Sequence, residues 1–241
     1  FLTSFGWVLA GWMKTAEPDI EVGRRNFPRW DIDHPMIRTW VQQYVSALYP
    51  EACAASGTNM VRIHNLANEP HFAMREGGWA VEYGVSEHTK DKYQAWLQAK
   101  YGTVANLNAV HGASYPDFVA ARNAFPFYTT NANPKKWGMP LSLRGGPVWY
   151  DVCRFNMDRV NDWFTFLADV TRTNDPGGWG CTIKLTGWSL TDPWHDGGLD
   201  LEYLAKLQGV LGSDLNNASW RGRDIRDRPA PWKNHYSMKW I

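Results

Sequence analysis

Strand-like and helix-like patterns alternate along the sequence, and this alternation restricts the fold more than any other feature. Apolar runs bounded by glycine or polar loops predict buried strands at 3–12, 60–67 and 178–188. Apolar residues at helical spacing predict helices over 36–49, 151–170 and 200–211, and two more after Ser86. Strands that alternate with helices form parallel βαβ units. The pattern predicts an α/β fold, and we expect a (β/α)₈ TIM barrel of which this chain holds a central portion.

Single residues predict where the helices begin and end. Pro50 lacks a backbone N–H, so we expect it to end or kink the first helix. Ser86, Thr103 and Asp200 are expected to cap helices, because their side-chain oxygens can accept a backbone N–H. The stretch 112–147 has Pro, Asn and Gly throughout and predicts a long loop.

Length and charge exclude several classes of protein. A chain of 241 residues suits one large domain over 1–241. Lys and Arg number 25 against 24 Asp and Glu, with no basic block, which argues against a nucleic-acid partner. The apolar opening at 1–13 is too short for a membrane span and lacks the basic start of a signal peptide. It resembles a strand that has already begun, so we expect the chain to be a fragment.

Tryptophan and cysteine usage adds two expectations. The 15 Trp residues either fill the core or present flat surfaces on which sugar rings can stack, and we expect the core to hold most of them. Cys53, Cys153 and Cys181 match no zinc spacing, and their odd number argues against a disulfide scaffold. We therefore expect three buried free thiols, with one disulfide as the alternative, and no metal or cofactor.

The segment Asn68-Glu69-Pro70 directly follows the predicted strand 60–67. In a (β/α)₈ barrel the catalytic groups lie at the carboxyl ends of the strands. Pro70 favours extended backbone at Glu69, and Asn68 offers an amide for a substrate hydroxyl. The segment fits a glycosidase proton donor at Glu69, and on its own it fits an ordinary loop equally well.

The following segment, 86–118, carries a more specific pattern of pairs and short runs. These are Trp96-Leu97, Lys100-Tyr101-Gly102-Thr103, Leu107-Asn108 and His111-Gly112. The pattern resembles the segment after the acid/base residue in bacterial β-galactosidases of glycoside hydrolase family 42 and related galactan-degrading enzymes. That family usually has Trp-Gly at the last pair, so His111 is a departure. Clear resemblance covers about 59–118.

The resemblance implies a retaining glycoside hydrolase on a (β/α)₈ barrel. Glu69 would be the general acid/base at the end of the fourth strand, with Asn68 as its partner. The nucleophile would be a Glu at the end of the seventh strand, and no Glu here occupies such a place. We expect the chain to run from about strand three to strand six, with the nucleophile outside it. A complete but unusual domain that uses an Asp is the alternative.

Other candidate substrate-binding residues lie near the ends of the two later strands. Arg62 and His64 alternate along one strand and share a face; they lie either inside the barrel below Glu69 or in a buried ion pair elsewhere. The rest are expected to line the cleft: His71, Trp79, Lys184, Trp188, Trp194 and His195. Lys184 could reach a sulfate or acidic group, or serve a structural role.

The loop 192–200 admits three interpretations. Asp, His and Asp at short spacing could bind a metal; Gly-turned backbone could lead to Asp200 as a helix cap; or Trp194 could stack on a sugar while His195 bonds a hydroxyl. We favour the last two over the metal site.

Three functions follow from these observations. The first is a retaining glycosidase that cleaves β-galactosidic or related linkages in oligo- or polysaccharides. The second is a non-catalytic carbohydrate-binding protein on a degenerate barrel, and the third is a metal-dependent hydrolase that uses His195 and Asp196. The expected partner is a carbohydrate and not a membrane; a homo-oligomer stays open, and a polysaccharide substrate favours a secreted or periplasmic site.

Overall fold

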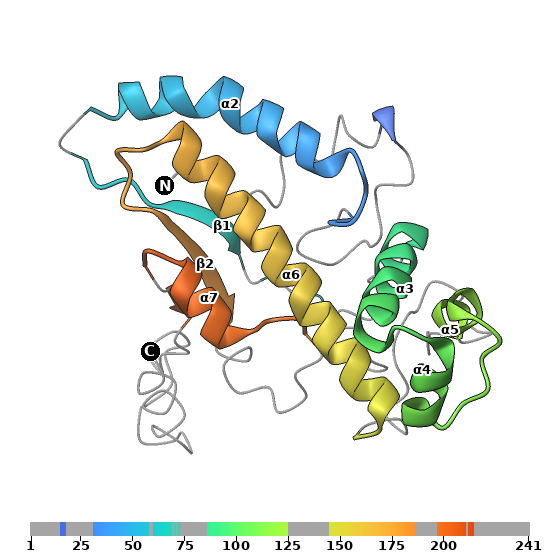
Figure 1. Cartoon of the computed structure of the whole chain (residues 1–241). Helices are drawn as coiled ribbons and strands as arrows, with labels where there is room; N and C mark the ends of the chain where they lie inside the picture. The colour runs from blue at the N-terminus through green and yellow to red at the C-terminus, as the bar shows by residue number, and fades with distance from the viewer. Residues whose placement is uncertain are drawn as a thin grey trace, which may run out of the picture.

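A computed structural model describes residues 15–17, 31–57, 60–68, 70, 72, 86–124, 145–186, 197–210 and 212–214. These residues form a parallel sheet of three strands in the order β1-β2-β3 (Figure 1). The strands are β1 (His64–Asn68), β2 (Cys181–Thr186) and β3 (Gly212–Asp214). The predicted parallel βαβ arrangement is confirmed. The strand expected at 3–12 lies outside the described residues.

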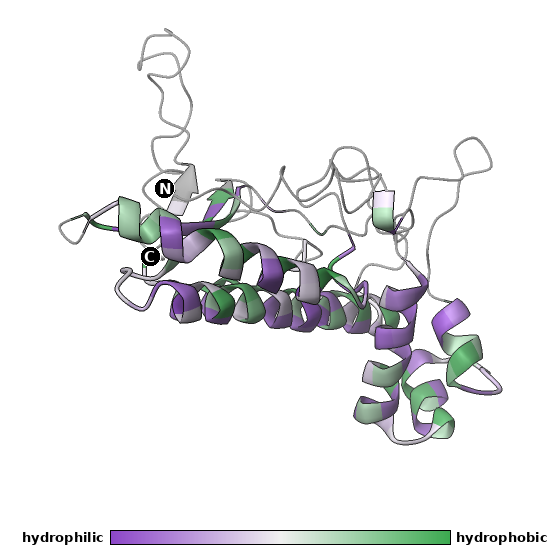
Figure 2. Ribbon diagram, turned by 90° about the horizontal axis from the view of Figure 1, so that it is seen from above, coloured by the Kyte–Doolittle hydropathy of each residue, from purple (hydrophilic) through white to green (hydrophobic). Residues whose placement is uncertain are grey.

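Three of the six helices in the described ranges pack against one face of the sheet, and the other three lie beside it. The six helices are α2 (Ile37–Ala55), α3 (Glu87–Tyr101), α4 (Val104–His111), α5 (Phe118–Asn123), α6 (Pro147–Asn174) and α7 (Leu201–Leu207). The long helix α6 passes across the strands, and α3, α4 and α5 gather around its first turns (Figures 1 and 2). None of the helices in the described ranges is long and apolar enough to cross a membrane.

The three predicted helix caps are confirmed. Ser86 accepts the N–H of Thr89 at the start of α3, and Thr103 accepts the N–H of Asn106 at the start of α4. Asp200 accepts the N–H of Tyr203 at the start of α7. Each contact spans three residues, which is why the local sequence suffices to predict it.

Pro50 does not end its helix, so the first of the two predicted outcomes, an end or a kink, is wrong. Helix α2 continues through Pro50 to Ala55. Proline inside a helix costs about 3 kcal/mol because it removes one hydrogen bond and crowds the preceding turn. The side chains on both sides of the proline, Tyr49 and Cys53, pack in the main core, and this packing offsets the cost.

Three other boundaries also differ from the prediction. Helix α6 begins at Pro147, a favoured first position, and has 28 residues instead of 20. The predicted loop 112–147 contains helix α5, which Asp117 caps. Helix α7 ends at Leu207 because Gln208 leaves helical geometry, and its Oε1 accepts the N–H of Ile183 in β2 at 2.7 Å. Strand β3 follows, which the sequence pattern did not reveal.

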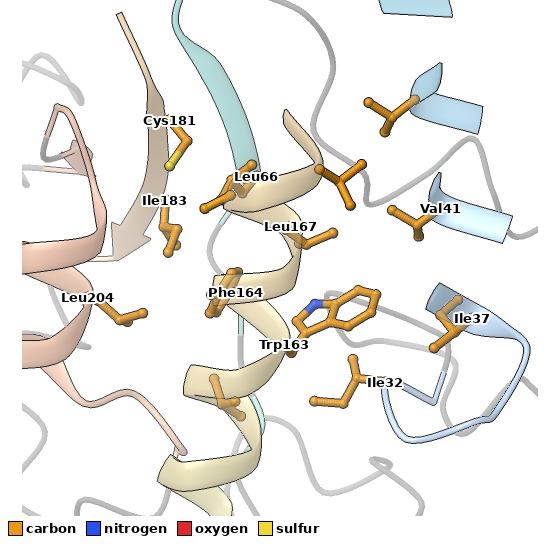
Figure 3. Close-up of a cluster of buried hydrophobic side chains, with 14 of the residues drawn as sticks. Ile32, Ile37, Val41, Leu66, Trp163, Phe164, Leu167, Cys181, Ile183 and Leu204 are labelled. Carbon is orange, nitrogen blue, oxygen red and sulfur yellow. The ribbon is translucent and has the colours of Figure 1, made fainter. Parts of the chain in front are cut away.

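The described residues hold two apolar clusters. The larger one lies between the sheet and helices α2, α6 and α7, where Leu66 and Ile183 of the strands meet Phe164 and Leu167 of α6 (Figure 3). The smaller one joins α3, α4 and α5 to the first turns of α6, around Tyr93. The smaller cluster therefore stabilises a helical lobe, residues 86–124, beside the sheet.

None of the three cysteines forms a disulfide. Cys153 and Cys181 are buried, as predicted, whereas Cys53 is only partly buried. Burial raises the pKa of the Cys181 thiol, which keeps it in the uncharged form that the core tolerates.

Candidate functional site

The carboxyl ends of β1 and β2 bring Asn68 and Lys184 together. The two residues are partners in the parallel ladder between these strands. In β2, Cys181 and Ile183 lie in the main core, so Thr182 and Lys184 alternate onto the opposite face of the sheet. Asn68 shares that face with Lys184 because paired residues of a parallel ladder point the same way.

A bulge in β1 decides this orientation. The ladder shifts register between Asn65 and Ala67, so Leu66 has no partner in β2. Leu66 is buried in the core, and Ala67 packs against the same cluster. Strict alternation would put Asn68 on the helix-facing side with Leu66, and the extra residue turns it to the other face.

The face that Asn68 and Lys184 share is polar along its length. Asn65 and Thr182 are also partners in the ladder on this face. Asn65 Oδ1 and Thr182 Oγ1 are buried, and neither has a hydrogen-bond partner within the described residues. Buried oxygens without partners are costly, so this face is suited to take up further polar groups.

Glu69 lies outside the described residues, but the chain on both sides of it is described. Asn68 ends β1, and Pro70 is buried. Phe72 is fully buried against Phe164 of α6, with the ring centroids 6.2 Å apart. The N–H of Phe72 donates to the carbonyl of Gly197 at 3.2 Å, and its carbonyl accepts from Asn156 Nδ2 at 2.8 Å. Both flanks of position 69 are thus held by the sheet and the core.

A buried polar network stands behind Phe72. Arg159 donates to Asn156 Oδ1 at 2.8 Å and to Asp33 Oδ2 at 2.6 Å. Asp33 also accepts from Thr89 Oγ1 at 2.7 Å. Burial raises the pKa of the Asp33 carboxyl, but the charges of Arg159 and Lys92 outweigh it and hold the pKa below its usual range. The carboxylate therefore balances the buried guanidinium.

The sequence carries a signal for this network, although none of its members was among the predicted site residues. Asn156 and Arg159 lie on the buried side of α6 among Val152, Phe155 and Val160. Polar residues within an apolar helical stripe need buried partners, and this requirement predicts a hydrogen-bonded cluster. The sequence could not identify Asp33 as the partner, because it is 126 residues away.

His64 forms the buried ion pair that is the second of its two interpretations. It begins β1, opposite the end that carries Asn68, and its ring stacks on Tyr49 of α2 with centroids 4.7 Å apart. Its Nε2 lies 2.7 Å from Asp175 Oδ2. This geometry gives His64 a structural role, and a role in substrate binding stays a prediction.

Asp175 is the centre of that ion pair. Arg62 Nη2 donates to Asp175 Oδ1 at 2.9 Å, and Arg62 Nε donates to Oδ2 at 3.0 Å. These hydrogen bonds, with a smaller contribution from His64, lower the pKa of Asp175 to about 2 although burial opposes the shift. The carboxylate is therefore ionised and paired at neutral pH.

The same place offers three groups that metals prefer. Ligand atoms of Cys53, His64 and Asp175 all lie within 4.8 Å of one another. Arg62 already neutralises the carboxylate through paired hydrogen bonds, and a divalent cation would meet this positive charge at close range. The geometry favours a structural ion pair over a metal centre.

The remaining predicted site residues divide into two groups. Lys184 is described and lies beside Asn68. The others lie outside the described residues: His71, Trp79, Trp188, Trp194 and His195. Of the loop 192–200, the described end has Gly198 at φ +73° and Asp200 as the cap of α7, which agrees with the Gly-turned interpretation for this part.

The residues that carried the family resemblance build the helical lobe. Asp151 of α6 accepts hydrogen bonds from Lys100 and from Tyr101 Oη, the latter at 2.6 Å, and lies 2.9 Å from His111 Nε2. Asn108 holds Tyr115 through two hydrogen bonds of 2.9 Å. His111, the departure from the family pattern, therefore supplies a partner for a buried carboxylate, and these contacts stabilise the helical lobe.

Comparisons with known proteins agree on the fold. No protein-family model matches the chain, and no curated protein matches its sequence. An exo-carrageenase of glycoside hydrolase family 42 from Bacteroides ovatus is 29% identical, with a TM-score of 0.68 over 84% of this chain and 26% of that protein. A β-galactosidase from Halorubrum lacusprofundi is 16% identical, with a TM-score of 0.57 over 86% of this chain and 28% of that protein.

A more distant structure shares the architecture. The catalytic domain of a β-amylase from Paenibacillus polymyxa is 13% identical, with a TM-score of 0.57 over 84% of this chain and 54% of that domain. The chain thus spans about a quarter of the first two proteins and about half of the third. It has part of a TIM-barrel fold like that of the family 42 glycoside hydrolases, as predicted.

Proposed function

We propose that this chain belongs to a retaining glycoside hydrolase in which Glu69 is the general acid/base. The observation that carries the proposal is the place of Glu69 in the chain, directly after β1 in a fold like that of the family 42 enzymes. The carboxyl end of a barrel strand is where catalytic groups of this architecture lie. Asn68 pairs with Lys184 in the sheet, and the carbonyl of Phe72 accepts a hydrogen bond from Asn156. These contacts on both sides of position 69 support the proposal.

The chemistry follows from two carboxyl groups on opposite sides of the glycosidic bond. The acid donates its proton to the leaving oxygen while a second carboxylate attacks the anomeric carbon, and the glycosyl-enzyme forms. The first group, now a base, then removes a proton from the water that releases the sugar. We place the second carboxylate outside this chain, because the chain covers about a quarter of the similar glycosidases.

Asn68 and Lys184 are proposed to bind the sugar beside Glu69. Asn68 can donate its amide to a ring hydroxyl, and Lys184 can pair with an anionic substituent such as a sulfate ester. Their shared face and ladder pairing support this arrangement. His71, Trp79, Trp188, Trp194 and His195 are proposed to complete the cleft, with the Trp rings stacking on sugar faces.

The substrate class follows from the similar proteins. One is an exo-carrageenase and another is a β-galactosidase, so both names point to galactose-containing glycosides. We propose β-galactosidic or related linkages in oligo- or polysaccharides as the target.

The test uses the full-length protein and a Glu69→Gln variant. Both are assayed on aryl β-galactosides and on a panel of algal galactans, with and without azide. We expect the variant to lose about 10²- to 10⁴-fold in kcat, the usual contribution of general acid–base catalysis. Azide needs no general base, so it should restore turnover and give a β-glycosyl azide.

Glu202→Gln is the matched control. Glu202 lies on the exposed side of α7, where it pairs with Lys206 at 2.7 Å. This control should keep wild-type activity. Full activity of Glu69→Gln would overturn the proposal, and sugar binding without turnover by the wild-type protein would favour a non-catalytic carbohydrate-binding protein.

A further inference from the structure

Asn156 lies where three segments of the protein meet. It is 1% exposed and belongs to α6. Its Nδ2 donates to the carbonyl of Phe72, three residues after Glu69, at 2.8 Å. The segment from β2 to α7 approaches the same side chain, as Gly198 shows.

Gly198 leaves no room between its backbone and Asn156. A Cβ at this position would lie 2.8 Å from Asn156 Nδ2 and 2.9 Å from Val160 Cγ2. The backbone also has φ +73°, which side-chain-bearing residues rarely adopt. The neighbouring Gly197 accepts the N–H of Phe72 at 3.2 Å. Asn156, Phe72 and the Gly197–Gly198 turn thus form one packed unit.

Arg159 fixes which way the Asn156 amide points. A guanidinium can only donate, so it requires the amide oxygen on its side, and Arg159 Nε donates to Asn156 Oδ1 at 2.8 Å. The NH₂ group must then face the carbonyl of Phe72. Asp33 accepts from Arg159 at 2.6 Å and balances its charge, so this buried ion pair holds the guanidinium, and with it the amide, in one orientation.

We propose that Asn156 is a positioning residue for the acid/base. It holds the segment that follows β1, which carries Glu69, against the end of the segment that follows β2. Both segments leave the carboxyl ends of adjacent parallel strands, where a barrel builds its cleft. The inference rests on the proposed role of Glu69 and adds a residue that does not itself touch the sugar.

The experiment separates acid positioning from general stability. Asn156→Asp and Asn156→Ala are made in the full-length protein and assayed on two β-galactosides, with 2,4-dinitrophenol and phenol as leaving groups. Asn156→Asp keeps the side-chain volume and the acceptor for Arg159 but removes the donor to Phe72, so it is the variant expected to fold. The weakly acidic phenol needs a proton from the enzyme as it leaves, and dinitrophenol does not.

We expect kcat/KM to fall about 10- to 100-fold on the phenyl substrate, because small displacements of a catalytic group cost rates of this size. On the dinitrophenyl substrate it should change by less than about threefold. Asn174→Ala is the matched control, since it removes an amide at the far end of α6 that donates to the Val170 carbonyl of the same helix. It should lower both rates equally or not at all, and thermal denaturation of every variant checks the fold.

Two failures can be told apart. If Glu69→Gln itself shows no preference between the two leaving groups, the proposed role of Glu69 is wrong. If Glu69→Gln loses activity selectively on the phenyl substrate while Asn156→Asp loses it equally on both, or not at all, Asn156 has only a structural role and the inference is overturned.

Discussion

Asn68 and Lys184 are ladder partners at the carboxyl ends of adjacent strands, and a bulge at Leu66 creates this pairing. Leu66 stays in the core, and the residue after next is turned to the opposite face. A short strand can thus direct a polar side chain away from the helices without losing the buried contact of Leu66. The relationship gives the proposed cleft an amide and an ammonium side by side.

Lys184→Gln should weaken the action on anionic galactans selectively. A charge-assisted hydrogen bond contributes about 1.5–3 kcal/mol, so kcat/KM on a sulfated galactan should fall about 10- to 100-fold. Activity on the desulfated polymer should stay within about threefold, since its sugars carry no anion for the ammonium. The measurement is reducing-sugar release from both polymers.

Lys206→Gln serves as the control for Lys184. This lysine lies on the exposed side of α7, paired with Glu202. It should leave both activities unchanged. Equal losses on the two polymers in Lys184→Gln would assign this lysine a structural role.

Asp175→Asn should destabilise the protein strongly. The substitution leaves the half-buried guanidinium of Arg62 without its anionic partner, next to the buried His64. The loss should exceed that at an exposed ion pair, because the carboxylate of Asp175 is itself buried. Urea unfolding at neutral pH measures the loss. Asp169→Asn, an exposed residue of α6 that pairs with Arg172, should cost less than about 1 kcal/mol.

The same carboxylate should make part of the stability depend on acid pH. The pKa of Asp175 is lowered to about 2 in the folded state, from an ordinary value of 3.8. A lowered folded-state pKa stabilises the protein above pH 4, and this contribution is lost as the pH falls from about 4 to 2. The difference in unfolding free energy between wild type and Asp175→Asn should therefore shrink across that range. A constant difference in urea unfolding from pH 4 to pH 2 would contradict the ionised, paired state.

Asp151→Asn should loosen the helical lobe. Burial raises the pKa of the Asp151 carboxyl, but hydrogen bonds from His111, Lys100 and Tyr101 outweigh burial and hold the pKa below its usual value. The ionised form is therefore the one that binds these groups. The amide cannot accept from all of these groups, and we expect a loss on the order of 2–3 kcal/mol. Hydrogen exchange should quicken in α3 and α4 and stay nearly unchanged in α2. Asp162 of α6 is exposed and pairs with Arg38 of α2, and Asp162→Asn should show no such pattern of exchange.

Local sequence was sufficient for features whose partners are a few residues apart. The caps Ser86, Thr103 and Asp200 were predictable because each bonds to a residue three positions later. Two of the expected strands and the five expected helices were predictable from periodicity, with errors at their ends. Glu69 was singled out by its place after a strand and by the family resemblance, and its role stays a prediction because it lies outside the described residues.

The sequence by itself determined the alternation of the two longer strands with helices, the caps of three helices and the apolar faces, because these depend on neighbours along the chain. Tertiary structure decided which way polar residues point. His64 turns toward Asp175, 111 residues away, and Asn156 bonds Phe72, 84 residues away. The bulge at Leu66, the passage of α2 through Pro50 and the short strand β3 also depend on packing against distant segments. The free energy of such long-range contacts exceeds the conformational preference of the local sequence, and the periodicity of the sequence does not predict them.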